Sequence, residues 1–350
     1  LKPFKGYCTD VFFDEGLKFI ERNKENEFFC YIACNAPHTP LNVDPGYHEM
    51  YKDKTDDKKA RFYGMITNID ENFGILRDKL KEWELEDNTI LIFMTDNGSD
   101  SGIETDENHF VTSGYNTGLR GKKLSHYDGG HRVPFFISWA GGGRDIDTLA
   151  ANVDFMPTIL DICEVEKRPG IEFHGKSLLP LLNRTGNWED RALVTDNQRH
   201  PLPIKWNKSA VMTQRWRLIE DRELYDMDVD RGQCNDVAGK YPEVVEKLKV
   251  EYEKWWEIVS RQFDNMIPIH IGDYPVNILG QDMRNDECVA AWGQHLVRKG
   301  LKALGYWEIL VEEDGEYEFE LRRWPESHER GLSKGIEGDD IEFYRNGVDE

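Results

Sequence analysis

The amino-acid sequence predicts an α/β fold, followed by a smaller antiparallel sheet and a β-rich extension. Three patterns predict it. An amphipathic helix pattern leads into the apolar run from Thr89 to Met94, short strand patterns with tight turns begin near Ala192, and alternating apolar residues recur after Trp307. We therefore expect three parts, at residues 1–190, 191–265 and 266–350.

The composition is that of a folded, acidic protein. Of 350 residues, 39% are hydrophobic and 12% aromatic, and the formal net charge is −22. This hydrophobic content is enough for a core, and the negative charge argues against nucleic acid or an anionic membrane as a partner. No apolar run reaches the length of a membrane span.

Helix and strand patterns alternate in the first part. Thr9-Asp10 and the apolar spacing over 13–23 predict a capped amphipathic helix. The apolar run 28–34 predicts a buried strand, and apolar residues every three to four positions predict a long helix over 58–83. A further strand is expected over 133–140 and a short helix over 154–163.

The run from Thr89 to Gly98 predicts a strand that is covered on both faces and ends on Asp96 and Asn97. Gly98 permits a sharp turn there, so that both side chains can direct one oxygen to the same point. A carboxylate beside an amide carbonyl is half of a site for a hard cation. The alternative is an Asp-Asn-Gly turn that simply leaves the sheet.

Two loops offer groups for an anion. His38 follows the strand predicted over 28–34 and stands between Pro37 and Pro40, which favour an extended backbone that presents the side chain. The loop 118–132 is rich in glycine and basic residues, which predicts an oxyanion pocket where the backbone approaches a ligand closely. The alternatives are a solvated histidine and a solvated basic loop.

The second and third parts are predicted to be mostly β-structure. Short strands are expected over 192–196, 210–214 and 216–220, and a helix from Pro242 to about Phe263. In the extension, alternation over 307–311 and 317–321 with a turn at 312–315 predicts a hairpin. This extension would either cover the first part or bind carbohydrate through its aromatic side chains.

Four stretches together resemble the sulfatase family, of the formylglycine-dependent arylsulfatase type, in the alkaline phosphatase superfamily. They are Ala36-Pro-His-Thr-Pro-Leu41, Thr95-Asp-Asn-Gly98, the segment from Gly121 to Pro134 with its Lys-Lys-Leu-Ser-His-Tyr-Asp-Gly-Gly core, and Glu223-Leu-Tyr-Asp-Met227. Their order and spacing match over roughly residues 6–248. The resemblance implies an alkaline-phosphatase-like α/β/α sandwich with its N-terminal part missing, a smaller antiparallel sheet, and calcium-assisted hydrolysis of sulfate esters.

The resemblance also implies roles for individual residues. Asp96 and Asn97 look like two ligands of the calcium ion, and His38 like the histidine that contacts the sulfate ester near its leaving-group oxygen. Lys123, five residues before Asp128, looks like the lysine that binds the sulfate oxygens. Lys122 is the alternative register, because Leu124 stands where many relatives have glycine.

The family's nucleophile is expected outside this sequence. In the family it is a formylglycine made from cysteine or serine in a Cys-x-Pro-Ser-Arg-like motif, with an early Asp-Asp pair as further metal ligands. No cysteine of this chain lies in such a motif: Cys8, Cys30, Cys34, Cys163, Cys234 and Cys288. We therefore expect an N-terminal segment of the same domain to complete the site, a sulfated small molecule or glycan as substrate, and a periplasmic or secreted location by family analogy.

Two other functions stay open at the level of the sequence. A phosphoester or phosphonate hydrolase of the same superfamily would use a similar half-site, since sulfate and phosphate differ more in charge than in shape. A sulfatase-like binding protein without a nucleophile would be non-catalytic. Arg120, His126 and His131 flank the predicted pocket and are candidates for reading a sugar ring or a carboxylate, with ordinary surface roles as the alternative.

Overall fold

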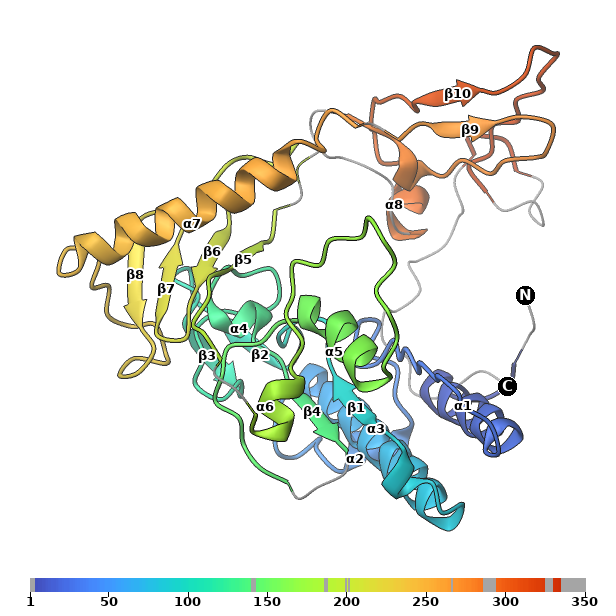
Figure 1. Ribbon diagram of the computed structural model, residues 1–350. Coiled ribbons are helices and arrows are strands. Elements are labelled where there is room, and N and C mark those ends of the chain that lie inside the picture. Colours follow the sequence, from blue (N-terminus) through green and yellow to red (C-terminus); the bar gives the residue numbers. More distant parts are fainter. Residues whose placement is uncertain are drawn as a thin grey trace. The chain divides into compact units, whose positions relative to one another are not determined.

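The computed structural model describes residues 4–139, 143–185, 188–198, 200, 202–265, 267–285, 294–324 and 330–334. They form two compact units, one mainly from residues 4–197 and 208–252 and the other mainly from 198–207 and 253–334. The first unit mixes helices with short sheets, so the predicted α/β class is confirmed (Figure 1).

Two helices supply the first core of this unit. Phe13 and Ile20 of α1 (Cys8–Asn23) form a buried cluster with Leu76 and Leu80 of α3 (Asp57–Glu82). The predicted long helix is thus confirmed to within a residue at each end. The predicted cap of the first helix is wrong, because α1 begins at Cys8 and has no side-chain cap; Asp10 instead accepts hydrogen bonds from Asn68 and Asn72 of α3.

The predicted buried strand over 28–34 is not formed as a strand. Its residues alternate between half-buried and exposed, with Phe29 and Tyr31 at 70% and 81% exposure. The half-buried residues pack on the α1–α3 cluster. The segment therefore has the side-chain alternation of a strand without ladder partners among the described residues.

The strand before Asp96 is shorter and less buried than predicted. β1 (Leu91–Met94) is half-buried with Met94 exposed, so it is not covered on both faces. It pairs antiparallel with β4 (Phe135–Ser138), with Phe93 opposite Phe136. A separate two-stranded hairpin joins β2 (Ile103–Thr105) to β3 (Val111–Gly114). The short helices and turns of this part are α2 (Pro45–Glu49), η1 (Glu86–Asn88), α4 (Asp128–His131), η2 (Asn152–Asp154), α5 (Phe155–Ile162) and α6 (Leu179–Asn183).

The predicted small antiparallel sheet is confirmed. Its four strands pair in chain order (Figure 1): β5 (Leu193–Asp196), β6 (Ser209–Met212), β7 (Trp216–Ile219) and β8 (Glu223–Asp226). Ala210, Ile219 and Tyr225 form a buried cluster with Tyr127 from the basic loop. The helix predicted after this sheet is α7 (Pro242–Ser260), which buries Val245, Leu248 and Tyr252.

The second unit contains little regular structure. The predicted hairpin over 307–321 is wrong: β10 (Ile309–Val311) pairs in parallel with β9 (Ile269–Ile271), and 317–321 forms no strand. Its other described elements are the end of α7 from Glu253 on, η3 (Gly280–Asp282) and α8 (Gln294–Lys299). Residues 335–350 of the expected extension lie outside the described ranges. Where the structure describes the chain, no helix has the length and apolar character to cross a bilayer.

Candidate metal and anion site

Asp96 and Asn97 lie directly after β1, where the strand gives way to a turn. Asp96 is exposed and Asn97 half-buried. The Thr95 hydroxyl donates to the Asn97 carbonyl over 3.2 Å, and Asn97 Nδ2 donates to the Gly98 carbonyl over 3.0 Å. Because its NH₂ group is bonded to the chain, Asn97 keeps Oδ1 for a ligand. A carboxylate and an amide oxygen are the donors that a hard cation prefers.

Backbone hydrogen bonds join this strand end to the basic loop. The Gly98 N–H donates to the Gly130 carbonyl over 2.9 Å, and the Lys123 N–H donates to the Ser99 carbonyl over 2.8 Å. Lys123 is therefore held beside the residues that follow Asn97. The structure thus bonds the backbone of Lys123 to that of Ser99, two residues after Asn97.

Gly129 and Gly130 of the loop, and Gly98 at the strand end, serve backbone packing rather than the predicted approach to a ligand. A Cβ atom on Gly98 would overlap the Gly129 carbonyl, one on Gly129 the Gly121 carbonyl, and one on Gly130 the Ser125 carbonyl. The space that they leave open is filled by protein backbone. The glycine-rich sequence therefore fixes the loop against the strand end.

Leu124, the residue that departs from the family pattern, has a backbone φ of 73° and an exposed side chain. This left-handed conformation is one that glycine adopts freely and that a leucine adopts at a cost. The chain therefore keeps the turn with a less favourable residue. Lys122 and Lys123, which directly precede Leu124, are both half-buried.

His38 is exposed, and the described contacts of its side chain lie within its own loop. Its Nδ1 is 2.6 Å from the Thr39 carbonyl oxygen, and its backbone N–H donates to the Asn35 carbonyl over 2.9 Å. The loop is anchored by Leu41 and Val43, which pack on α3. No contact among the described residues joins His38 to Asp96, Asn97 or Lys123, so its place in a common site stays a prediction.

Arg120 is a buried structural residue rather than a group on the pocket wall. Its guanidinium carbon lies 3.8 Å from the Tyr127 ring centroid, Nε donates to the Asn108 carbonyl over 2.9 Å, and Nη1 donates to Tyr225 Oη over 2.8 Å. These contacts commit the guanidinium to holding the loop against its neighbours. The interpretation of Arg120 as a substrate reader is therefore wrong.

The histidines of the loop are also packed against protein. His126 lies against Tyr127, with ring centroids 4.6 Å apart, and 3.9 Å from Glu220. His131 Nε2 is 3.4 Å from the His126 carbonyl oxygen. Burial lowers the pKa of both imidazoles, so each is neutral over a wider pH range than a free histidine.

Three buried residues hold this loop in place, and two of them, Arg217 and Gln233, were not predicted from the sequence. Asp128, Arg217 and Gln233 are 1%, 5% and 0% exposed. Arg217 Nε donates to Asp128 Oδ1 over 2.9 Å, and the Asp128 N–H donates to Gln233 Oε1 over 2.8 Å. A signal for Arg217 was present, because an arginine inside the apolar strand pattern 216–219 needs a buried partner.

The donor chemistry of Asp96 and Asn97 fits a hard cation, but two residues supply only part of a coordination shell. Calcium takes about six to eight oxygen ligands. Across the part of the chain that the structure describes, no three His, Cys, Asp or Glu side chains come together to hold a metal. Asp96 and Asn97 would therefore contribute to a shell that needs further oxygens.

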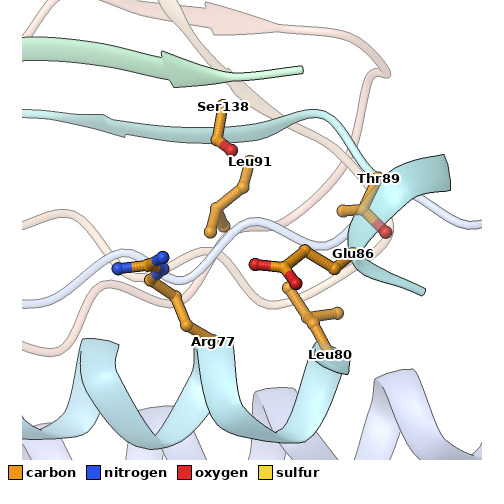
Figure 2. Close-up of a pocket in the computed structure, with 6 residues that line it drawn as sticks. All are labelled: Arg77, Leu80, Glu86, Thr89, Leu91 and Ser138. Atoms are coloured by element: carbon orange, nitrogen blue, oxygen red, sulfur yellow. The ribbon is translucent and has the colours of Figure 1, made fainter. Parts of the chain in front are cut away.

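A small pocket seen in the structure is separate from this site. It lies between α3 and the start of β1, as Figure 2 shows, and is lined by Arg77, Leu80, Glu86, Thr89, Leu91 and Ser138. Asp96 and Asn97 follow the opposite, carboxyl end of β1. The pocket reflects the packing of helix on strand.

Two family models match the chain. The sulfatase model matches residues 1–165, and the model of the C-terminal part of N-sulphoglucosamine sulphohydrolase matches residues 118–257. The sulfatase YdeN of Escherichia coli, itself uncharacterized, is 30% identical over 51% of this chain and 32% of its own length. An N-acetylgalactosamine-6-O-sulfatase of Bacteroides thetaiotaomicron is 26% identical over 69% of this chain and 49% of its own length.

A solved structure shows a related fold. The structure of Ps i-CgsB in complex with k-i-k-neocarrahexaose superposes with a TM-score of 0.62 at 23% identity, over 75% of this chain and 60% of that one. The chain therefore spans less than half the length of both curated relatives and 60% of this structural neighbour.

Proposed function

Because this chain belongs to the sulfatase family, we propose that it carries the cation-binding and sulfate-binding part of a sulfuric ester hydrolase. The observation that supports this most directly is the pair of backbone bonds from Lys123 to Ser99 and from Gly98 to Gly130. They hold an ammonium-bearing loop beside a strand end that carries a carboxylate and an amide. The activity is proposed for the complete protein, since the chain spans part of its relatives' length.

The proposed roles follow from where charge develops in the reaction. Hydrolysis of a sulfate monoester moves negative charge onto the leaving oxygen and the sulfuryl oxygens. Lys123 would donate hydrogen bonds to a sulfuryl oxygen, and His38 would donate a proton near the leaving oxygen. A calcium ion held in part by Asp96 and Asn97 would supply positive charge beside the same oxygens.

The nucleophile is proposed to be a formylglycine on a segment outside this sequence. The absence of the nucleophile motif around all six cysteines supports this. A sulfated glycan is the proposed substrate class, which the N-acetylgalactosamine-6-O-sulfatase relative supports. A periplasmic or secreted location stays a prediction from the family resemblance.

An assay of the complete protein on matched aryl sulfate and aryl phosphate substrates tests the proposal. We expect faster turnover of the sulfate. Lys123→Ala should lower kcat/KM by about a hundredfold or more, the effect of removing one charge-stabilising donor, and Asp96→Ala should lower it similarly. Lys122→Ala is the matched control, and a larger effect at Lys122 would move the assignment by one residue.

Three outcomes contradict the proposal. Faster turnover of the phosphate would make the protein a phosphoester hydrolase. A complete protein that is inert on both esters would favour a non-catalytic binding role. An Asp96→Ala variant as active as the parent would contradict the proposed role of Asp96 in holding the cation.

A further inference from the structure

The loop that carries Lys123 is fixed at both ends by one buried glutamine. Gln233 Oε1 accepts a hydrogen bond from the Asp128 N–H over 2.8 Å, and the Gln233 carbonyl accepts one from Arg120 Nη1 over 3.0 Å. Arg120 and Asp128 flank Lys123 in the sequence, and Gln233 is 0% exposed. A single residue outside the loop therefore holds both ends of the segment from Arg120 to Asp128.

The two ends of this segment are also hydrogen-bonded to each other and to the four-stranded sheet. The Gly129 N–H donates to the Arg120 carbonyl over 2.8 Å and closes the neck of the loop. Arg217 of β7 donates to Asp128, and Tyr225 of β8 accepts from Arg120. The loop is thus clamped between the sheet on one side and the Gly98–Ser99 backbone on the other.

We propose that Gln233 is a positioning residue that sets the place of Lys123 relative to Asp96 and Asn97. The inference rests on the proposed function and extends it to a residue outside the four motif stretches. Without Oε1, the buried Asp128 N–H loses its acceptor, and the loop shifts to recover one. A displacement of about an ångström is enough to lower the rate of a positioned reaction severalfold to a hundredfold.

The test is a double-mutant cycle in the complete protein with an aryl sulfate. Gln233→Met keeps the side chain's approximate shape, removes the Oε1 acceptor of the Asp128 N–H, and leaves the backbone carbonyl that accepts from Arg120 in place. We expect it to lower kcat/KM about tenfold, as loss of a supporting hydrogen bond does at other sites. In the Lys123→Ala background the same change should have an effect below about twofold, because its influence passes through Lys123.

Thr158→Val is the matched control for simple destabilisation. Thr158 is 3% exposed and its Oγ1 accepts from the Leu178 N–H over 2.8 Å, so its removal also leaves a buried amide without a partner. This variant should keep its kcat/KM. If Gln233→Met behaves like Thr158→Val, or if its tenfold loss persists without Lys123, the positioning role is overturned while the proposed function stands.

Amide hydrogen exchange gives a readout that does not depend on turnover. Gln233→Met should speed exchange at the Lys123 and Gly98 amides, and Thr158→Val should leave both unchanged. Unchanged exchange in Gln233→Met contradicts the inference even if activity falls. If Lys123→Ala retains full activity, the proposed function fails first.

A second variant covers the case in which Gln233→Met does not fold. Tyr225→Phe removes the hydroxyl that accepts from Arg120 Nη1 and leaves the ring in place. It should speed exchange at the Lys123 amide and lower kcat/KM in the same Lys123-dependent way. Independence from Lys123 would overturn the inference here too.

Discussion

His109 and His126 lie against each other, with ring centroids 5.5 Å apart, at the junction of the basic loop and the four-stranded sheet. Burial lowers the pKa of each below the ordinary value of 6.5. The folded protein therefore holds both rings neutral at a pH where an unfolded chain would begin to protonate them.

We expect stability to fall as the pH drops below 6.5 and through the lowered pKa values. The sign follows because the unfolded chain binds more protons in this window, so each drop in pH favours unfolding. Urea midpoints at pH 7.5 and 5.5 measure the effect. A His109→Gln, His126→Gln double variant should lose less stability between these pH values than the parent, and an equal loss would exclude the pair as its source.

Gly98 and Gly74 offer a matched comparison of two glycines. Gly98→Ala would place a methyl group on the Gly129 carbonyl, whereas a methyl group on Gly74 of α3 would meet nothing within 4 Å. Gly98→Ala should destabilise by about 1–3 kcal/mol through overpacking. Gly74→Ala should stabilise by about 0.5–1 kcal/mol. Thermal unfolding of both variants checks this, and equal effects would contradict the close backbone packing.

At the residue scale, the sequence predicted candidate site residues that lie within short motifs. It did not predict the buried partners of the loop, which lie far from it in the sequence. Asp96, Asn97 and Lys123 were singled out as candidates because they belong to short sequence motifs. Arg217 is 89 residues from Asp128 and Gln233 is 105, so no local pattern connects these partners. Such pairs become visible once the fold brings them together.

At the scale of elements, periodicity predicted which segments are helices and which side chains face a core. α3, the four-stranded sheet and α7 follow the predicted ranges closely. Strand pairing was less predictable, since alternation does not say which segment is the neighbour. This is why 28–34 alternates without forming a ladder and β10 pairs with β9 rather than with 317–321.

The four-stranded sheet should be sensitive to loss of core volume. Leu218 of β7 is 0% exposed, and Leu218→Ala should cost about 2–5 kcal/mol from lost burial and the cavity left behind. Val229→Ala is the control, because Val229 is 83% exposed and its truncation should change stability by less than about 0.5 kcal/mol. Urea denaturation of both variants gives the comparison. A small effect at Leu218 would show that this sheet is not part of the cooperative core.

At the scale of the whole molecule, the chain divides into two units that differ in the size of their buried apolar core. Ile271 and Trp324 are the buried apolar residues described in the second unit, while Leu304, Phe319 and Leu321 are 93%, 66% and 72% exposed. Because this unit buries little apolar surface, the hydrophobic effect contributes little to its free energy of unfolding. The second unit should therefore unfold more easily than the first.

Calorimetry should accordingly show two transitions. Leu218→Ala should lower the temperature of the higher one and leave the lower one in place, since Leu218 belongs to the first unit. A single transition that moves as a whole with Leu218→Ala would show that the units unfold together.

The 105-residue separation of Asp128 and Gln233 also sets the order of events during synthesis. At translation rates of about 5–20 residues per second, the loop emerges from the ribosome roughly 5 to 20 seconds before the glutamine that clamps it. Throughout that interval the strand end with Asp96 and Asn97 can form, but its neighbouring lysine loop lacks its anchor. The hydrogen bond between Asp128 and Gln233 can therefore form only after all four strands of the sheet, which ends at Asp226, have been synthesised.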